Sequence, residues 1–137
     1  MKYLGLDLGA KSLGLALSDR TGTIATFYKS IRYEDENKLI EELKEIITNE
    51  NVEKLVLGFP KNMDNSVGFR GEETICFKEK LEKEINQEII LQDERLSTRL
   101  AENVLINADL SRKKRKKVID GVSAVVILQS YLDKKGE

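Results

Sequence analysis

The chain has no histidine and no tryptophan, and its 137 residues include a single cysteine and a single proline. Without histidine, one chain cannot form a Ser-His-Asp triad, use an imidazole base or build a histidine metal site. Cys76 alone cannot form an internal disulfide or a multi-cysteine zinc site. We expect Cys76 to lie in a helix as a small buried or half-buried apolar residue.

A signal-peptide core and a bilayer-spanning run are also lacking. Asp7 interrupts the first apolar stretch, and no later apolar run is long enough to cross a membrane. We therefore expect a cytoplasmic protein. A length of 137 residues, with 40% hydrophobic residues, predicts a single domain over 1–137 with one core.

The net charge is −1, but the positive charge is unevenly distributed. Six consecutive cations form one run, and the rest of the chain has 17 basic and 24 acidic residues, a net charge of −7. The run consists of Arg112, Lys113, Lys114, Arg115, Lys116 and Lys117. Such a local patch suits a phosphate backbone, although a solvated face at a helix start is the alternative.

Hydrophobic periodicity predicts strands at 2–7, 12–18, 21–31, 54–57 and 88–92. It predicts helices around 39–47, 74–85, 97–107 and 117–132. Short connections between the first three strands indicate an antiparallel meander, and the later strand–helix–strand units should add parallel strands by right-handed crossovers. We expect an α/β fold with helices flanking a mixed five-stranded sheet.

Asp7 is the first candidate for chemistry. Alternation along the first strand places Asp7 on the same side as Gly5, and the second strand has a side of small residues. If these sides share a face, Asp7 stands above a shallow floor, and glycines at 5, 9 and 14 allow a helix or ligand to come close. The alternative is an aspartate that forms a turn or caps a helix.

Two further acidic sites come later in the chain. Asp93-Glu94-Arg95 directly follows the fifth strand, where open α/β sheets present ligands. The alternative there is an acidic pair at a helix N-terminus. Asp120 lies in an otherwise apolar helix, where an unpaired carboxylate is costly, unless it is exposed and paired with Lys116 or Lys117.

Asp7, Glu94 and Asp120 together suggest a site for hard cations. Carboxylates without a nearby histidine suit Mg²⁺ or Mn²⁺. Two such ions about 4 Å apart can activate a water and stabilise the leaving oxygen of a phosphodiester. We therefore take these three residues as candidate metal-binding catalytic residues.

Four segments, in the right order and spanning nearly the whole chain, resemble the motifs of the YqgF/RuvX-like family. They are Leu4–Ser12 with Ser18-Asp19, Gly58–Ser66, Asp93–Thr98, and Arg115–Asp120 with Ile127–Asp133. The resemblance implies a ribonuclease H-like fold related to Holliday-junction resolvases. It also implies a nuclease in the 5′-end processing of pre-16S ribosomal RNA, with Asp7, Glu94 and Asp120 as its catalytic carboxylates.

The match has two small departures. Lys11-Ser12 stands where the family often has Lys-Arg, and Gln92 stands where an aromatic residue is common. The missing arginine removes one possible phosphate contact but leaves the carboxylates intact.

Candidate nucleic-acid contacts surround these motifs. Arg95 could bind a phosphate bidentately or could hold Glu94 in place. Four Tyr, four Phe and no Trp disfavour extensive base stacking, so recognition by shape and backbone is expected. Besides the six-cation run, the candidates are Lys11, Asn62, Arg70, Arg95, Ser97 and Thr98.

Three functions remain open on the sequence. The first is a structure-selective nuclease, acting as a monomer or homodimer on an RNA precursor or on four-way DNA junctions. The second is a non-catalytic nucleic-acid binding module that kept the fold. The third is an actin-like ATPase or sugar kinase, which is disfavoured because those proteins close two such domains around a nucleotide.

Overall fold

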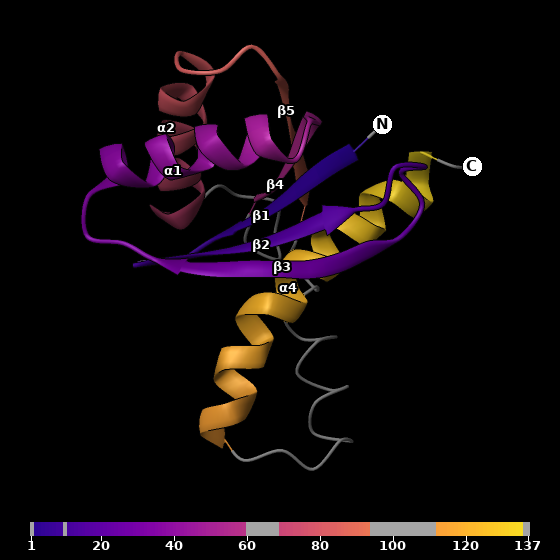
Figure 1. Cartoon of the computed structure of the whole chain (residues 1–137). Coiled ribbons are helices and arrows are strands. Elements are labelled where there is room, and N and C mark those ends of the chain that lie inside the picture. Colours follow the sequence, from indigo (N-terminus) through magenta and orange to yellow (C-terminus); the bar gives the residue numbers. More distant parts are fainter. Residues whose placement is uncertain (1, 10, 60–68, 94–111, 136–137) are drawn as a thin grey trace.

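The structure is a computed structural model that describes residues 2–9, 11–59, 69–93 and 112–135, apart from the side chains at 69, 70, 93, 112–122 and 135 (Figure 1). It contains five strands and three helices within these ranges. In chain order they are β1 (Lys2–Leu8), β2 (Ser12–Ser18), β3 (Ala25–Arg32), α1 (Glu36–Asn49), β4 (Val52–Phe59), α2 (Phe69–Glu82), β5 (Glu88–Asp93) and α4 (Arg112–Lys135).

The five strands form one mixed sheet in the order β3-β2-β1-β4-β5. β1 pairs antiparallel with β2, and β2 pairs antiparallel with β3. β1 pairs parallel with β4, and β4 pairs parallel with β5. The expected meander with parallel additions is therefore confirmed.

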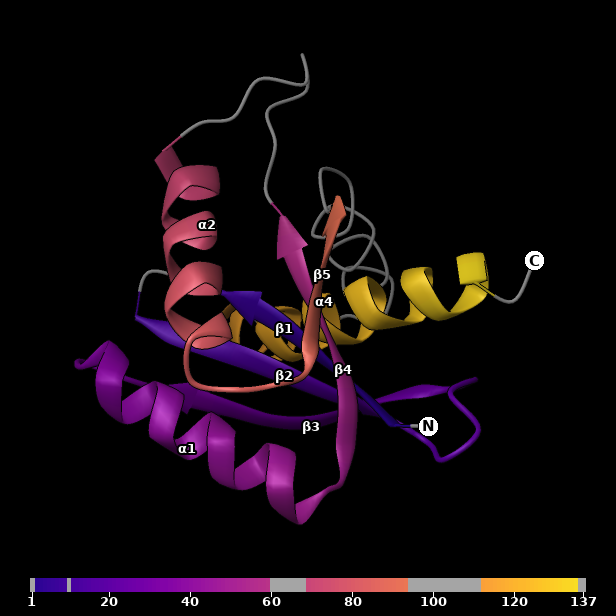
Figure 2. The same cartoon turned by 90° about the horizontal axis from the view of Figure 1, so that it is seen from above.

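Helices α1 and α2 cover one face of the sheet, and α4 covers the other (Figures 1 and 2). The larger core lies between the sheet and α1 and α2, where Leu4 and Leu6 of β1 meet Leu43 of α1 and Phe77 of α2. The second core lies under α4. The alternation of side chains along β1 explains why this strand contributes to both cores, because successive side chains point to opposite faces of the sheet.

Helix α1 begins where Asp35 accepts a hydrogen bond from the backbone N–H of Asn37 at 2.9 Å. A carboxylate at this position satisfies a backbone donor that the first helical turn leaves unpaired. The apolar stripe expected from the sequence is buried, at Leu39, Ile40, Leu43, Ile46 and Ile47.

Helix α4 approaches the sheet most closely at Gly5. A Cβ atom on Gly5 would lie 2.7 Å from Leu128 Cβ and 3.1 Å from the carbonyl oxygen of Ala124. A side chain at position 5 would therefore overlap the helix, and glycine lets the two backbones pack directly. The close approach expected at this glycine is confirmed.

The third strand begins later than the sequence predicted, at Ala25 rather than at residue 21. The Asp19 carboxylate accepts hydrogen bonds from the Thr21 hydroxyl at 2.5 Å and from the backbone N–H of Thr23 at 2.8 Å and of Ile24 at 3.2 Å. These bonds fold residues 19–24 into a turn, so apolar character at Ile24 does not extend the strand.

Two helix predictions also needed correction. The predicted helix 74–85 is α2 at Phe69–Glu82, and the last helix begins at Arg112 rather than near residue 117. The six cations therefore occupy the first turns of α4. The predicted helix at 97–107 lies outside the described residues.

Cys76 lies in a helix as expected, but its predicted burial is wrong, because the side chain is exposed. Helix α2 buries a stripe at Thr74, Phe77 and Leu81. Each residue turns a helix by about 100°, so the residue before Phe77 points away from this stripe.

Candidate functional site

The C-terminal ends of β1, β4 and β5 meet at one edge of the sheet, because the three strands run parallel (Figure 2). The register aligns Leu6 of β1 with Leu57 of β4, and Leu57 with Leu91 of β5. Asp7 is the next residue of β1 beyond this row. We call this side of the sheet the C-terminal edge.

Asp7 is half-buried and lies on the face that α4 covers. This follows from its alternation with Tyr3 and Gly5, which both pack against α4. Its neighbour on β2 is Gly14. Since Gly14 has no side chain, it leaves room beside Asp7 on this face of the sheet.

Contacts in the C-terminal part of α4 set the direction of the helix relative to β1. Tyr131 packs against Tyr3 with ring centroids 5.7 Å apart, and Ala124 and Leu128 meet Gly5. Helix and strand are therefore antiparallel. Position 120 lies one helical turn before Ala124 on the same stripe. Because helix and strand are antiparallel, position 120 and Asp7 both lie beyond the Gly5 contact, in the same direction.

The Gln129 side chain fastens α4 to the loop between β2 and β3. Its carbonyl oxygen accepts from the Ala25 backbone N–H at 2.8 Å, and its amide nitrogen donates to the Thr23 carbonyl at 2.9 Å. The same nitrogen donates to Asp133 Oδ1 at 2.9 Å. Gln129 lies in the fourth motif segment, but local periodicity could not indicate this role, because its partners at Thr23 and Ala25 are more than 100 residues away.

The other predicted site residues divide into three groups. Lys11 is exposed in the turn between β1 and β2, while Arg70 and the cation run belong to the first turns of α2 and α4, with side chains outside the description. Asn62, Glu94, Arg95, Ser97 and Thr98 lie outside the described residues altogether.

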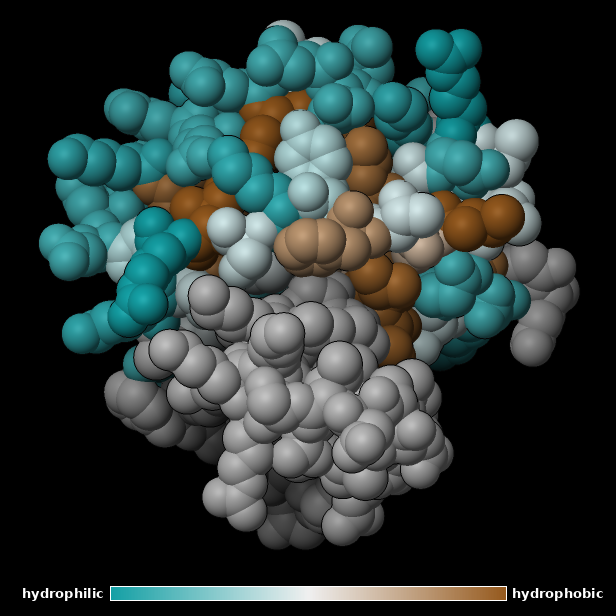
Figure 3. Space-filling model, turned by 60° about the horizontal axis from the view of Figure 1, so that its bottom comes forward, coloured by the Kyte–Doolittle hydropathy of each residue, from teal (hydrophilic) through white to brown (hydrophobic). Residues whose placement is uncertain are grey.

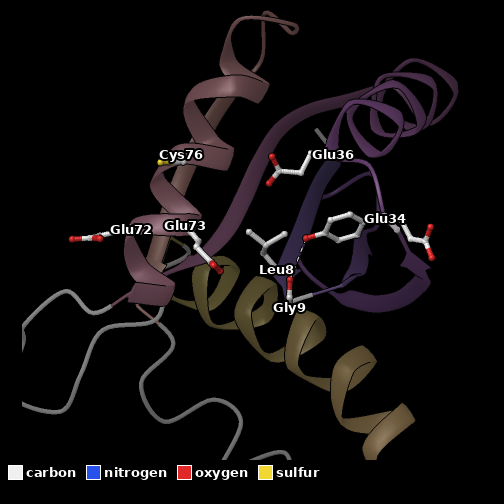
Figure 4. Close-up of a pocket in the computed structure, with 8 residues that line it drawn as sticks. Leu8, Gly9, Glu34, Glu36, Glu72, Glu73 and Cys76 are labelled. Carbon is white, nitrogen blue, oxygen red and sulfur yellow. Dashed lines mark hydrogen bonds between the residues drawn. The ribbon is translucent and has the colours of Figure 1, made fainter.

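On the opposite face, the C-terminal edge carries a hollow of about 460 Å³ (Figure 4). Figure 4 shows Glu73 of α2 and Glu36 of α1 on opposite sides of Leu8. Lys80 forms an ion pair with Glu36 at 2.6 Å. The lining consists of Leu8, Gly9, Tyr33, Glu34, Glu36, Glu72, Glu73 and Cys76. We call it the acidic hollow, and it was not predicted.

Tyr33 connects the acidic hollow to the end of β1. Its hydroxyl donates to the Gly9 carbonyl at 3.2 Å. Burial raises the pKa of this phenol, and the charges of Glu36 and Glu73 raise it further. The phenol therefore stays protonated at neutral pH. An acidic lining of this kind repels anions such as phosphate.

Within the described ranges, no three Asp, Glu or Cys side chains are arranged to hold a metal ion. Two of the three candidate carboxylates, Glu94 and Asp120, fall outside that description. On the α4 side of the edge, the Asp7 carboxylate has oxygen atoms that could bind a metal ion, and the chain has no imidazole. Oxygen donors of this kind suit a hard divalent cation.

Comparison with known proteins identifies the family. A family model described as "RuvX: Holliday junction resolvase" matches residues 1–134. The chain belongs to the RuvX family. This membership confirms the resemblance inferred from the four motifs.

Similar curated proteins share about half of their residues with this RuvX-family chain. One from Staphylococcus saprophyticus is 51% identical over 135 residues, covering 96% of this chain and 95% of that protein. One from a Geobacillus species is 52% identical over 137 residues, covering 98% and 99%. Both are named "Putative pre-16S rRNA nuclease". The names of these relatives and the description of the family both denote enzymes that cleave phosphodiesters. They agree with the enzyme class expected from the sequence.

Solved structures confirm the ribonuclease H-like fold of the RuvX-family chain. Thermus thermophilus RuvC in complex with a Holliday junction aligns with a TM-score of 0.62 at 12% identity, covering 99% of this chain and 96% of that one. Fowlpox virus resolvase with junction DNA aligns with a TM-score of 0.59 at 14% identity, covering both chains fully. In the part of the chain that is described, no helix is both long and apolar enough to cross a membrane.

Proposed function

We propose that this RuvX-family chain is a metal-dependent nuclease that hydrolyses phosphodiesters of structured nucleic acid in the cytoplasm. One observation carries the proposal most directly. Asp7 lies near the C-terminal end of β1, the central strand of the sheet, on the face that α4 covers and beside Gly14, which has no side chain. Parallel α/β sheets bind ligands at this end of their strands.

Three carboxylates would form the site. Asp7 comes from β1, Glu94 directly follows β5, and Asp120 lies on the stripe of α4 that contacts Gly5. They would hold one or two Mg²⁺ or Mn²⁺ ions, which supply Lewis-acid activation of water and charge neutralisation when bound. Arg95 would bind a phosphate or orient Glu94.

The charge distribution supports nucleic acid as the substrate. Helix α4 has eight basic and two acidic residues, a net charge of +6, so the rest of the chain has a net charge of −7. The first turns of α4 would bind the phosphate backbone, because a local cluster of cations attracts phosphate even on an acidic protein. Lys11, Arg70, Asn62, Ser97 and Thr98 would add contacts around the edge.

Precursor 16S ribosomal RNA is the first substrate we propose. Relatives with about 50% identity are named for pre-16S rRNA, whereas the junction-bound neighbours share only 12–14% identity. A four-way DNA junction is the second candidate, favoured by the family's description. A resolvase would act as a symmetric dimer that cuts two strands, whereas an RNA nuclease can act as a monomer.

The decisive experiment compares cleavage of a labelled pre-16S RNA fragment and a four-way junction with Mg²⁺ or Mn²⁺. Asp7→Asn, Glu94→Gln and Asp120→Asn should each reduce the rate by at least about a hundredfold, because each removes charge from a preorganised site. Glu41→Gln, on the exposed side of α1, is the matched control and should retain the wild-type rate.

The same assay separates the nuclease from a binding module. Retained cleavage in all three carboxylate variants would overturn the proposed site. A wild-type chain that binds either substrate tightly but cleaves neither, at any metal concentration, would favour the binding module.

A further inference from the structure

The cation Arg32 lies at the C-terminal edge, on the same face of the sheet as Asp7. The register across three strands establishes this position. Asp7 pairs with Gly14, Gly14 pairs with Ser30, and Ser12 pairs with Arg32. Steps of two residues along a strand keep the same face, so Arg32 lies two residues beyond the row of Asp7 and on the same side.

A register shift in β3 decides which way Arg32 faces. Ala25 belongs to the core under α4, whereas Ile31 belongs to the core on the α1 and α2 face, although both are odd-numbered. The pairing skips a residue between Lys29 and Phe27, which reverses the alternation. Arg32 follows Ile31 and is exposed, so it lies on the α4 side.

Arg32 is near enough to Asp7 for one nucleic-acid strand to meet both. β1 and β3 are separated by two strand spacings, and Arg32 is two residues farther along. With about 4.8 Å between strands and about 3.4 Å per residue, the two Cα atoms are roughly 12 Å apart. A phosphate held by the long Arg32 side chain would be close to the scissile phosphate at Asp7.

The electrostatic setting of Arg32 favours an anion. Neither Arg32 nor Lys11 forms an ion pair among the described residues, whereas Lys29 of the same strand pairs with Glu42 at 2.8 Å. The Tyr33 backbone N–H donates to the Lys11 carbonyl at 3.0 Å, which holds the end of β3 against the β1–β2 turn. Arg32 therefore lies at a held strand end with no described carboxylate partner, and an anion beside its guanidinium would be stabilised.

The acidic hollow limits the path of the substrate to this side. Glu34, Glu72 and Glu73 line the opposite face of the same edge and form no ion pair among the described residues. Their charges repel phosphate there and leave the α4 side as the favourable approach. A strand that starts at the cations of α4 and crosses Asp7 would continue over the end of β3.

We propose that Arg32 binds a backbone phosphate of the substrate on the β3 side of the scissile bond. This inference rests on the proposed function, since it takes Asp7 as the position of cleavage. It names a phosphate contact that the four sequence motifs do not contain. Arg32 is a binding residue, so its loss should weaken affinity while leaving the chemical step unchanged.

The test measures binding and cleavage separately. Binding of a labelled pre-16S RNA fragment and of a four-way junction is followed by fluorescence anisotropy in EDTA, which prevents cleavage. Arg32→Ala should raise Kd roughly tenfold, since one charge-assisted contact is lost. The slope of log Kd against log salt should fall by about 0.7–0.9. At saturating substrate, kcat should match the wild type.

Lys38→Ala is the matched control, because Lys38 is an exposed cation of α1 on the other face of the sheet. It should leave Kd and the salt slope unchanged. Arg32→Glu should weaken binding further than Arg32→Ala, and both should keep the wild-type unfolding midpoint because the side chain is exposed.

Two results would distinguish this inference from the proposed function. Wild-type Kd and salt slope in Arg32→Ala would overturn the phosphate contact, even if Asp7→Asn abolishes cleavage. Retained cleavage in Asp7→Asn would overturn Asp7 as the catalytic position of the proposed function, whereas weakened binding in Arg32→Ala would still establish Arg32 as a nucleic-acid contact.

Discussion

Gly5 of β1 and Leu128 of α4 lie so close together that a Cβ atom at position 5 would stand 2.7 Å from Leu128 Cβ. Real Cβ atoms essentially never come so near, so this pair sets the height of α4 above the sheet. The proposed site depends on that height, because Asp7 follows Gly5 by two residues and position 120 precedes Leu128 by two helical turns.

Gly5→Ala should therefore destabilise the chain and slow cleavage together. Overpacking a filled core position costs about 1–3 kcal/mol, and relief of the overlap must move α4 or β1. Urea unfolding measures the first effect, and cleavage of pre-16S RNA measures the second. Ser130→Ala, on the exposed side of α4, is the control. A urea midpoint for Gly5→Ala equal to that of the wild type would mean that α4 moves without cost and that its contact with Gly5 does not fix the geometry of the site.

Gln129 should fix the position of α4 along the sheet. Gln129→Ala leaves the Ala25 N–H and the Thr23 carbonyl without their side-chain partner, which should cost about 0.5–1.5 kcal/mol. Hydrogen exchange at the Ala25 amide should accelerate more than the change in global stability explains. Asp133→Ala removes the bond within α4 alone and should leave that amide protected. Unchanged exchange at Ala25 in Gln129→Ala would contradict the role.

Much of the fold could be predicted because the relevant signals are local. The alternation of Leu4 and Leu6 with Tyr3 and Gly5 identified both faces of β1, and helical spacing identified the buried stripe of α1. The start of β3 could not be predicted in this way. The sequence pattern through Ile24 is typical of a strand, but hydrogen bonds from the backbone N–H groups of Thr23 and Ile24 to the Asp19 side chain fold this segment into a turn.

The candidate site was predictable only in part, because its remaining features depend on long-range pairing. Asp7 was recognisable from its glycine neighbours within one strand. Arg32 was not, because simple alternation from Ala25 assigns it to the wrong face, and a register shift with β2 reverses that assignment. Tyr33 and Gly9 are 24 residues apart, so no local pattern indicates their hydrogen bond.

Tyr33→Phe should loosen the end of β1 without disturbing the core. The substitution removes the bond from the Tyr33 hydroxyl to the Gly9 carbonyl at 3.2 Å, at a cost of about 0.5–1.5 kcal/mol. Tyr28→Phe is the matched control, because its hydroxyl is exposed and reaches Glu50 Oε1 only at 3.5 Å. Urea unfolding should give a lower midpoint for Tyr33→Phe than for Tyr28→Phe. Equal midpoints would show that the Gly9 bond contributes nothing measurable.

Asp19 should make stability depend on pH in the acid range. Its pKa is lowered from 3.8 to about 2, first by the hydrogen bond from the Thr21 hydroxyl and then by those from the backbone N–H groups of Thr23 and Ile24. Because the folded state binds this proton less readily than the unfolded state, the stabilisation is complete above about pH 4. It is lost as the pH falls through about 2, where the folded carboxyl is protonated too.

Asp19→Asn, which cannot ionise, isolates this contribution. Its urea midpoint should lie below the wild-type midpoint at pH 6, and the difference should shrink steadily as the pH falls from about 4 to about 2. Glu41→Gln, an exposed change on α1, should follow the wild-type pH profile. A difference between Asp19→Asn and wild type that stays constant down to pH 2 would mean that charge has no part in closing this turn. The effect would then come from the geometry of the hydrogen bonds alone.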